Sequence, residues 1–322
     1  MTFADRIRER YPEGLTAVVP IGGTRTMYIL EKQRHLDNPG DIGNFADHAD
    51  YLLEQYFAFI QLFFDLGGQN IIIPILAYDR FTAYGTRYAG LISDLTQMLI
   101  RDDAQAVYRE KNIDPYFLGT DTLVKLPSDH PGHGLGQALQ NFQRTWNYQE
   151  GRRKVLWEIA GLPLYSMWNT KNIIPLEEQA TLDADIEETH DIEKVRHLAY
   201  EHYSKALYGT ELPLPHFYLG CNRNGDLKMG SALSTTLTWG FMCRMFFVPY
   251  STMFITRETL QTIIEDVAFG KLMRSKTADY DNRYTPQMAE AEYQRVMELR
   301  ADPMTTVGLS RQVLAGTPDL DA

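Results

Sequence analysis

The stretch AVVPIGGTRTMYIL (residues 17–30) indicates a β-strand followed by a glycine-rich turn. The apolar run Thr16–Ile21 is typical of a buried β-strand, and it ends at two glycines followed by Thr24 and Arg25. Glycines allow a backbone to approach a ligand closely, and an arginine offers a fork of donors that suits phosphate oxygens. The pattern therefore favours an anion-binding turn for a phosphate or diphosphate. The alternative is a tight turn in which Arg25 pairs with a surface carboxylate.

Composition limits the classes of protein that this chain can belong to. The 322 residues carry a net charge of -11, and the sequence pI is about 5.2. An acidic chain lacks the basic face that a general nucleic-acid binder needs. There is no apolar run long enough for a membrane span, and Cys221 and Cys243 are too few for a disulfide framework. We therefore expect a cytoplasmic protein.

Strand-like and helix-like segments alternate along the rest of the sequence. This alternation predicts an α/β fold, a single domain over 1–322 with a central, mostly parallel sheet. A surface insertion is expected near 178–195 and a loosely held tail at 303–322. Further strands are predicted at 70–76, 114–119, 154–160, 216–220 and 244–249, and helices at 44–66, 91–112, 192–207, 256–271 and 286–300, with another helix that ends at 146.

Two segments carry more local predictions. Pro74 inside its predicted strand indicates an edge position or a bulge, because proline has no N–H for the ladder. SDHPGHGLG (residues 128–136) is interpreted as a loop. His130 and His133 within it have the spacing of zinc ligands, although no third ligand stands out and plain loop histidines are the alternative.

Several motifs, in order, resemble one known family. VVPIGGTRTMYILE is followed by a long helix, by IIPILAYDRF and by GTRY, and later by YFLGTDTLVKLP, FYLGCNRNGD, FFVPYSTMFITRETL and DYDNRY. This order is similar to the tuberculosinyl transferase (tuberculosinol synthase) branch of the cis-prenyltransferase family, which includes undecaprenyl diphosphate synthase. The likeness covers nearly the whole chain at low identity.

The resemblance implies a six-stranded, mainly parallel sheet with helices on both faces, in a protein that is usually a homodimer. It also implies an allylic prenyl diphosphate at the carboxyl edge of the sheet, with its tail in an apolar tunnel between helices. Magnesium would be bound through the diphosphate, and no protein ligand for it is assigned. The tunnel residues expected here are Tyr51, Phe59, Phe63 and Tyr78, for which core packing is the alternative.

The family motif Phe-Asp-Gly-Thr-Arg-Arg-Trp matches residues 21–27 of this chain. Its Gly-Thr-Arg core is kept as Gly23, Thr24 and Arg25, so a diphosphate cradle that also includes Gly22 carries over. The acidic residue of the family is Gly22 here, and the second arginine is Thr26. In elongating members that acid handles magnesium and the departure of diphosphate. Non-catalytic subunits of eukaryotic cis-prenyltransferases lack it too.

Other candidate residues follow from their places in these motifs. His48, Asp79 and Tyr88 are candidates for assisting the departure of diphosphate and controlling the cation, and Arg87 and Arg223 for binding the diphosphate. Each has a plainer alternative: an exposed histidine, a loop N-cap, a packed tyrosine or a solvated arginine.

The sequence thus predicts a prenyltransferase or terpene synthase that ionises an allylic diphosphate. Water, a small acceptor or the substrate's own double bonds would capture the cation. Two alternatives stay open: a non-catalytic subunit or prenyl-lipid binding protein, and a chain-elongating synthase.

Overall fold

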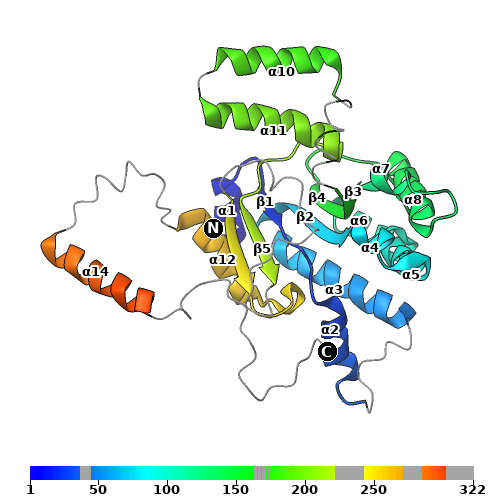
Figure 1. Cartoon of the computed structure of the whole chain (residues 1–322), viewed down its shortest axis with the longest axis horizontal. Coiled ribbons are helices and arrows are strands. Elements are labelled where there is room, and N and C mark those ends of the chain that lie inside the picture. The colour runs from blue at the N-terminus through cyan, green and yellow to red at the C-terminus, as the bar shows by residue number, and fades with distance from the viewer. Residues whose placement is uncertain are drawn as a thin grey trace.

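The computed structural model describes residues 1–36, 45–162, 165, 168, 172, 174–189, 191–221, 243–270 and 285–301. Within these ranges six strands form one sheet in the order β3-β4-β2-β1-β5-β6, and every pair of neighbours is parallel (Figure 1). The predicted α/β fold with a six-stranded sheet is confirmed. The strands are β1 (Leu15–Val18), β2 (Gly68–Ala77), β3 (Ile113–Leu118), β4 (Arg153–Gly161), β5 (Phe217–Cys221) and β6 (Arg244–Val248).

Helices cover both faces of this sheet. The helices are α1 (Phe3–Arg10), α2 (Thr24–Tyr28), α3 (Phe45–Asp65), α4 (Asp79–Thr82), α5 (Gly85–Gln97), α6 (Asp102–Glu110), α7 (Thr120–Leu123), α8 (Pro131–Thr145), α10 (Leu176–Glu188), α11 (Ile192–Tyr208), α12 (Arg257–Phe269) and α14 (Pro286–Ala301). Short pieces of other helix types are η1 (Ile29–Gln33), η2 (Met98–Ile100) and η4 (Thr252–Phe254).

The strands divide their side chains between two apolar cores. In a strand, successive side chains point to opposite faces. Ala17 and Val19 therefore join the large core that includes α3, α8 and α12, whereas Val18 joins the smaller core under α11. The other interior strands alternate in the same way, so both faces of the sheet are buried, as a parallel sheet requires.

Pro74 lies in a strand that is central, so the edge alternative is wrong. Strand β2 pairs with β1 on one side and with β4 on the other. The register with β4 shifts between Pro74 and Leu76, which is the irregularity that the bulge alternative predicted. The ladder skips a residue there because proline cannot donate a hydrogen bond.

The helix predicted over 91–112 is two helices. After η2 the backbone of Arg101 is extended, with φ -63° and ψ 160°, and α6 begins at Asp102. The carboxylate of Asp103 accepts from the amide of Ala104 at 2.9 Å. Asp favours helix starts for this reason, and hydrophobic periodicity does not reveal the break.

The segment predicted as a loop over 128–136 contains the start of α8. Pro131 is its first residue, and Nδ1 of His130 accepts from the amide of Gly132 at 3.1 Å. Pro at the first position suits a helix start. Nε2 of His130 contacts the carbonyl of Phe81 at 3.1 Å, and Nδ1 of His133 that of Leu126 at 2.9 Å. Both rings are thus engaged in local hydrogen bonds.

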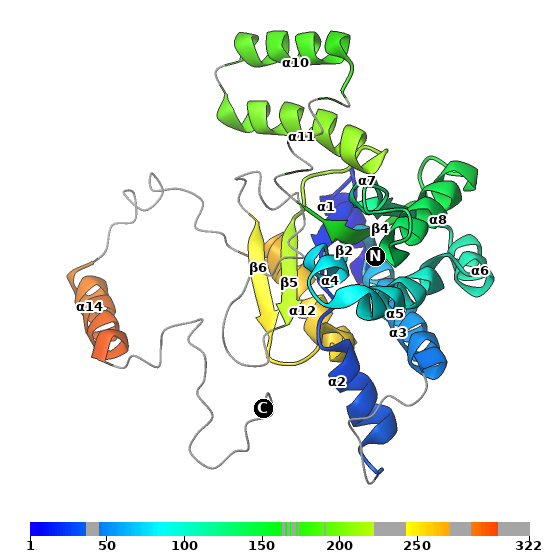
Figure 2. The ribbon, with the colours of Figure 1, turned by 45° about the vertical axis from the view of Figure 1, so that its right-hand side comes forward.

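Three further expectations concern the insertion near 178–195, the tail at 303–322 and the absence of a membrane span. Helix α10, in the region of the expected insertion, has no buried residue and lies against α11, away from the sheet (Figures 1 and 2). The tail at 303–322 lies outside the described residues. No helix in the described ranges combines the length and the apolar character that a membrane span requires.

Gly119 fixes the junction between β3 and α7. Its φ is 78°, and a Cβ added there would lie 1.8 Å from the carbonyl oxygen of Ile159. That oxygen belongs to the backbone of β4 and cannot move without breaking the sheet. The turn therefore admits glycine alone.

We predict that Gly119→Ala destabilises the protein by more than about 3 kcal/mol, through combined backbone strain and overlap. The matched control is Gly134→Ala, because a Cβ at Gly134 in α8 meets nothing within 4 Å. This control should gain about 0.5–1 kcal/mol from helix propensity. Urea unfolding of both variants measures the difference, and equal stabilities would contradict the assignment of Gly119.

His216 joins the amino ends of β1 and β5. Its Nδ1 accepts from the amide of Thr16 at 3.1 Å, and its own amide donates to the carbonyl of Thr16 at 2.9 Å. The ring lies 4.3 Å, centroid to centroid, from Tyr11. Burial lowers the pKa of His216 from 6.5 to about 4, and the charge of Arg10 acts in the same direction. The folded protein therefore holds this ring neutral.

We predict that His216 makes folding sensitive to mild acid. The unfolded chain takes up a proton near pH 6.5, whereas the folded chain does so only near pH 4, so stability is complete above pH 6.5 and falls between these values. The loss at pH 5 should be about 1–2 kcal/mol. Denaturant titrations at pH 7.5 and pH 5 measure it. In His216→Asn, which keeps an acceptor, the loss should shrink; an unchanged loss would assign it to other groups.

Candidate functional site at the carboxyl end of β1

The turn after β1 lies where the order of the sheet reverses. From β1 the chain moves to β2, β3 and β4 on one side, and then crosses to β5 and β6 on the other. In parallel sheets, ligands bind in the crevice outside the carboxyl ends of the strands at this reversal. Figure 2 shows α2 beyond the ends to which the arrows of β5 and β6 point, whereas α10 and α11 lie at the opposite end. The turn predicted from the sequence thus lies at this reversal point.

Gly22 and Gly23 give this turn its shape. Gly23 has φ 74° and ψ 21°, in the left-handed region that other residues rarely adopt, and it caps α2. The first hydrogen bond of α2 runs from the amide of Met27 to the carbonyl of Gly23 at 2.9 Å. A Cβ added at Gly22 would lie 3.2 Å from Sγ of Cys221, at the end of β5. The backbone of β1 therefore passes close against β5 here.

The charge of Arg25 lies near enough to His48 to act on its imidazole, although the two residues come from different helices. Arg25 is exposed in the first turn of α2, and His48 lies early in α3 with only 5% of its surface exposed. Burial lowers the pKa of His48, and the nearby charge of Arg25 lowers it further. Both ring nitrogens of His48 are buried and lack a hydrogen-bond partner among the described residues. The structure thus places a cation beside a neutral imidazole.

An orphaned buried imidazole indicates that something else completes this site. A buried polar atom without a partner costs about 1–3 kcal/mol, and such atoms are rare in folded proteins. A neutral imidazole carries one donor and one acceptor. The His48 imidazole therefore has one hydrogen to donate and one lone pair to accept with, and no partner among the described residues takes up either.

Aromatic rings line the same place. The ring of Tyr28, at the end of α2, lies 4.8 Å from that of His48 and 5.4 Å from that of Tyr51, both edge to face. The hydroxyl of Tyr51 donates to Oε2 of Glu31 at 2.5 Å, and burial raises the pKa of this tyrosine. An aromatic wall suits both a hydrocarbon tail and a cation, because the ring face is apolar and electron-rich.

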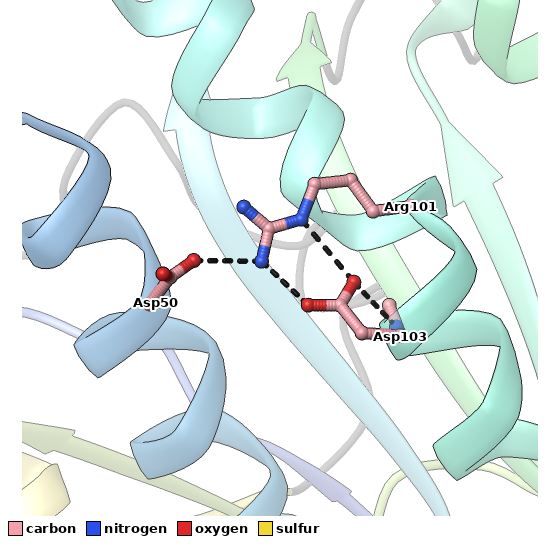
Figure 3. Close-up of polar contacts among 4 residues, drawn as sticks. Asp50, Arg101 and Asp103 are labelled. Atoms are coloured by element: carbon pink, nitrogen blue, oxygen red, sulfur yellow. Dashed lines mark hydrogen bonds and ion pairs between the residues drawn. The ribbon is translucent and has the colours of Figure 1, made fainter.

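An ion-pair cluster anchors the first turns of α3, which carry His48. Figure 3 shows Arg101 between two carboxylates: its Nη2 lies 2.7 Å from Oδ1 of Asp50 and 2.6 Å from Oδ2 of Asp103. The hydrogen bond to Arg101 holds the pKa of Asp103 below its usual value. All three side chains are largely exposed, so the cluster orients α3 and adds little stability.

Asp79, Arg87, Tyr88 and Arg223 are the other predicted catalytic and diphosphate-binding residues. Asp79 begins α4 directly after β2, at the same edge of the sheet as the turn, and it is half-buried. Arg87 and Tyr88 lie in the first turn of α5 and are exposed. The described ring contact of Tyr88 is with Tyr84, 5.4 Å away, and not with the turn. Arg223 lies outside the described residues.

The four predicted tunnel residues differ in their relation to the turn. Tyr51 adjoins it through Tyr28. Phe59 and Phe63 are buried in the large core, and Phe63 packs against Phe217 with ring centroids 6.4 Å apart. Tyr78 is partly buried against the same core, just before α4. Their role as a tunnel stays a prediction.

The described residues at the turn do not form a donor set for a divalent cation. No group of three His, Cys, Asp or Glu side chains with metal-binding geometry occurs among the residues that the structure describes. The position of the family acid is Gly22, which offers only backbone groups.

Sequence reasoning missed two contributors to the site. Tyr28 contacts His48, and Ser251 contacts the backbone of the turn from the segment after β6. The neighbouring Thr252 contacts Pro20, at the end of β1 and outside the turn. Tyr28 lies within residues 17–30, but its place in the sequence did not predict its contact with His48. Ser251 and Thr252 follow a predicted strand, and the rule that strand ends in a parallel sheet share one edge could have found them.

We predict that the pKa of His48 depends on Arg25. It should titrate below 6.5 in the wild type, and Arg25→Ala should raise its pKa by removing one of the two causes of the shift. Histidine-selective NMR measures both values. The control is Arg144→Ala, an exposed arginine of α8 that pairs with Asn141. An unchanged His48 pKa in Arg25→Ala would show that the charge of Arg25 does not act on His48.

Comparison with known proteins gave structural likenesses alone. No family model matches the sequence, and no curated protein matches it. One similar solved structure is lavandulyl diphosphate synthase from Lavandula x intermedia in complex with dimethylallyl diphosphate, with 12% identity, a TM-score of 0.49, and coverage of 80% of this chain and 96% of that chain. Another is a probable undecaprenyl diphosphate synthase from Campylobacter jejuni, with 11% identity, a TM-score of 0.47, and coverage of 80% and 97%. Each describes what the chain is similar to, and no reaction follows from them.

Proposed function

We propose that this protein is an enzyme of the cis-prenyltransferase type, close to the tuberculosinyl transferase branch, that ionises an allylic prenyl diphosphate. The observation that carries the proposal is the buried, orphaned imidazole of His48, on which the charge of Arg25 in the left-handed Gly23 turn acts. The ordered motifs of the sequence, and the aromatic wall of Tyr28 and Tyr51, support the choice of a prenyl substrate.

The diphosphate would bind at the turn from Gly22 to Arg25. Its charge grows as the allylic carbon–oxygen bond breaks, so donors fixed in advance at this point stabilise the transition state more than the ground state. Arg25 supplies a charged fork of donors, and the start of α2 supplies backbone amides. Arg87 and Arg223 are further candidates for the diphosphate, and magnesium would be carried by the substrate.

His48 would act on the leaving group or on the cation. As a neutral imidazole it can donate its N–H to the departing diphosphate, or use its other nitrogen to take a proton from an attacking water. Asp79 and Tyr88, at the same edge, are the further candidates for this step. Water, an acceptor or the substrate's own double bonds would then capture the cation.

A non-catalytic subunit is the second candidate function. Glycine at the position of the family acid favours it, because elongating members use that acid for diphosphate departure. Such a subunit would bind a prenyl diphosphate without turning it over. A chain-elongating synthase would in addition need a second site for isopentenyl diphosphate.

We predict pyrophosphate release that depends on Arg25. The assay uses geranyl, farnesyl, geranylgeranyl and bicyclic diterpenyl diphosphates, with and without magnesium and with and without isopentenyl diphosphate. Arg25→Ala should lower kcat/KM by about 10²–10³, the usual effect of removing one donor to a developing oxyanion. Arg144→Ala should leave the rate unchanged.

Each other outcome selects an alternative. Saturable binding of a diphosphate without release from any substrate would favour the non-catalytic subunit. Products lengthened by isopentenyl diphosphate would favour the elongating synthase. Release that survives Arg25→Ala would contradict the proposed cradle. The oligomeric state, expected to be a homodimer, is measured on the same sample by light scattering.

A further inference from the structure

Two hydroxyl groups reach the turn after β1 from a segment more than 200 residues away in the sequence. Oγ of Ser251 donates to the carbonyl of Gly22 at 2.7 Å, and Oγ1 of Thr252 donates to the carbonyl of Pro20 at 3.4 Å. Ser251 is 4% exposed, and Thr252 is fully buried. The segment that follows β6 is therefore built against the end of β1.

The hydroxyl of Ser251 has a fixed direction. While it donates to Gly22, its oxygen accepts from the amide of Met253 at 3.4 Å, which caps the short helix η4. A serine hydroxyl has a single hydrogen to donate. Since the position of the oxygen is set by η4, its hydrogen can serve the carbonyl of Gly22 and no other acceptor at the same time.

Ser251 donates a hydrogen bond to the peptide unit between Gly22 and Gly23, whose orientation the local sequence does not restrict. This peptide joins two glycines, which restrict backbone rotation least of all residues. Regular pairing of β1 with β2 extends as far as the amide of Val19, which donates to Ile72 at 2.8 Å, and Pro20 has no amide hydrogen to continue it. The orientation of the Gly22–Gly23 peptide thus depends on contacts from elsewhere.

We propose that Ser251 is a positioning residue that sets the direction of the Gly23 N–H toward the bound anion. A peptide unit is planar and trans, so its C=O and N–H point in opposite directions. By holding the Gly22 carbonyl toward η4, Ser251 turns the Gly23 N–H away from η4. If the peptide flipped, a carbonyl would face the diphosphate and repel it. This inference rests on the proposed function.

The test separates this role from simple support of the fold. The variants are Ser251→Ala, Ser251→Cys and, as the matched control, Thr252→Val, which removes a neighbouring buried hydroxyl that also holds the end of β1. Calorimetric titration with inorganic pyrophosphate and with geranylgeranyl diphosphate gives the affinities, and denaturant unfolding gives the stabilities of the same full-length samples.

We expect Ser251→Ala to weaken binding of both ligands by about tenfold, the value of one hydrogen bond of ordinary strength at an anion. Ser251→Cys keeps a weak donor and should fall between serine and alanine. Thr252→Val should lose a similar amount of stability but keep its affinity. With a turned-over substrate, the loss in Ser251→Ala should appear in kcat as well as in KM.

Different failures have different meanings. If the wild type binds pyrophosphate and Ser251→Ala binds it equally well, the positioning role is wrong and the proposed function stands. If Ser251→Ala and Thr252→Val lose affinity in proportion to their stability, Ser251 only supports the fold. If the wild type binds neither pyrophosphate nor any prenyl diphosphate, the proposed function falls, and the role of Ser251 with it.

Discussion

The hydrogen bonding of β1 between β2 and β5 is the constraint on which the candidate site depends. Because β1 is paired on both sides and buried on both faces, its last residues can leave the sheet only at the carboxyl edge. The following turn must then fit between Cys221 of β5 and the segment after β6. Gly22 allows the close approach to Cys221, and Gly23 adopts the left-handed backbone conformation.

Electrostatics gives this edge of the sheet its chemical character. The chain as a whole is acidic, yet Arg25 lies at the point of reversal, beside a histidine that burial and this same charge keep neutral. A neutral donor next to a fixed cation suits an anion whose charge is increasing, and protonation of His48 would add repulsion against Arg25. The aromatic rings of Tyr28 and Tyr51, which belong to the large core, pack in sequence from this histidine: Tyr28 contacts His48, and Tyr51 contacts Tyr28.

Side chains contact the backbone of the β3 edge of the sheet. On β3, the amide of Phe117 donates to the side chain of Gln143, and the carbonyl of Pro115 accepts from Tyr148, so side chains occupy its outer backbone groups. Occupied groups of this kind prevent pairing with another strand. Side chains of this chain therefore protect the β3 edge of the sheet.

The sequence by itself determined the six strands and a mostly parallel sheet, because apolar runs alternate with helix-length segments, whereas the order of the strands comes from the tertiary structure. It also placed the Gly–Thr–Arg turn at a strand end. Only the tertiary structure decided what surrounds that turn. Arg25 and Tyr28 lie near His48, and Ser251 contacts Gly22, so the site joins residues from separate segments. Hydrophobic periodicity does not predict such pairs. Local exceptions, such as the central position of Pro74 and the helix that begins at Pro131, likewise follow from neighbours in space and from single capping hydrogen bonds.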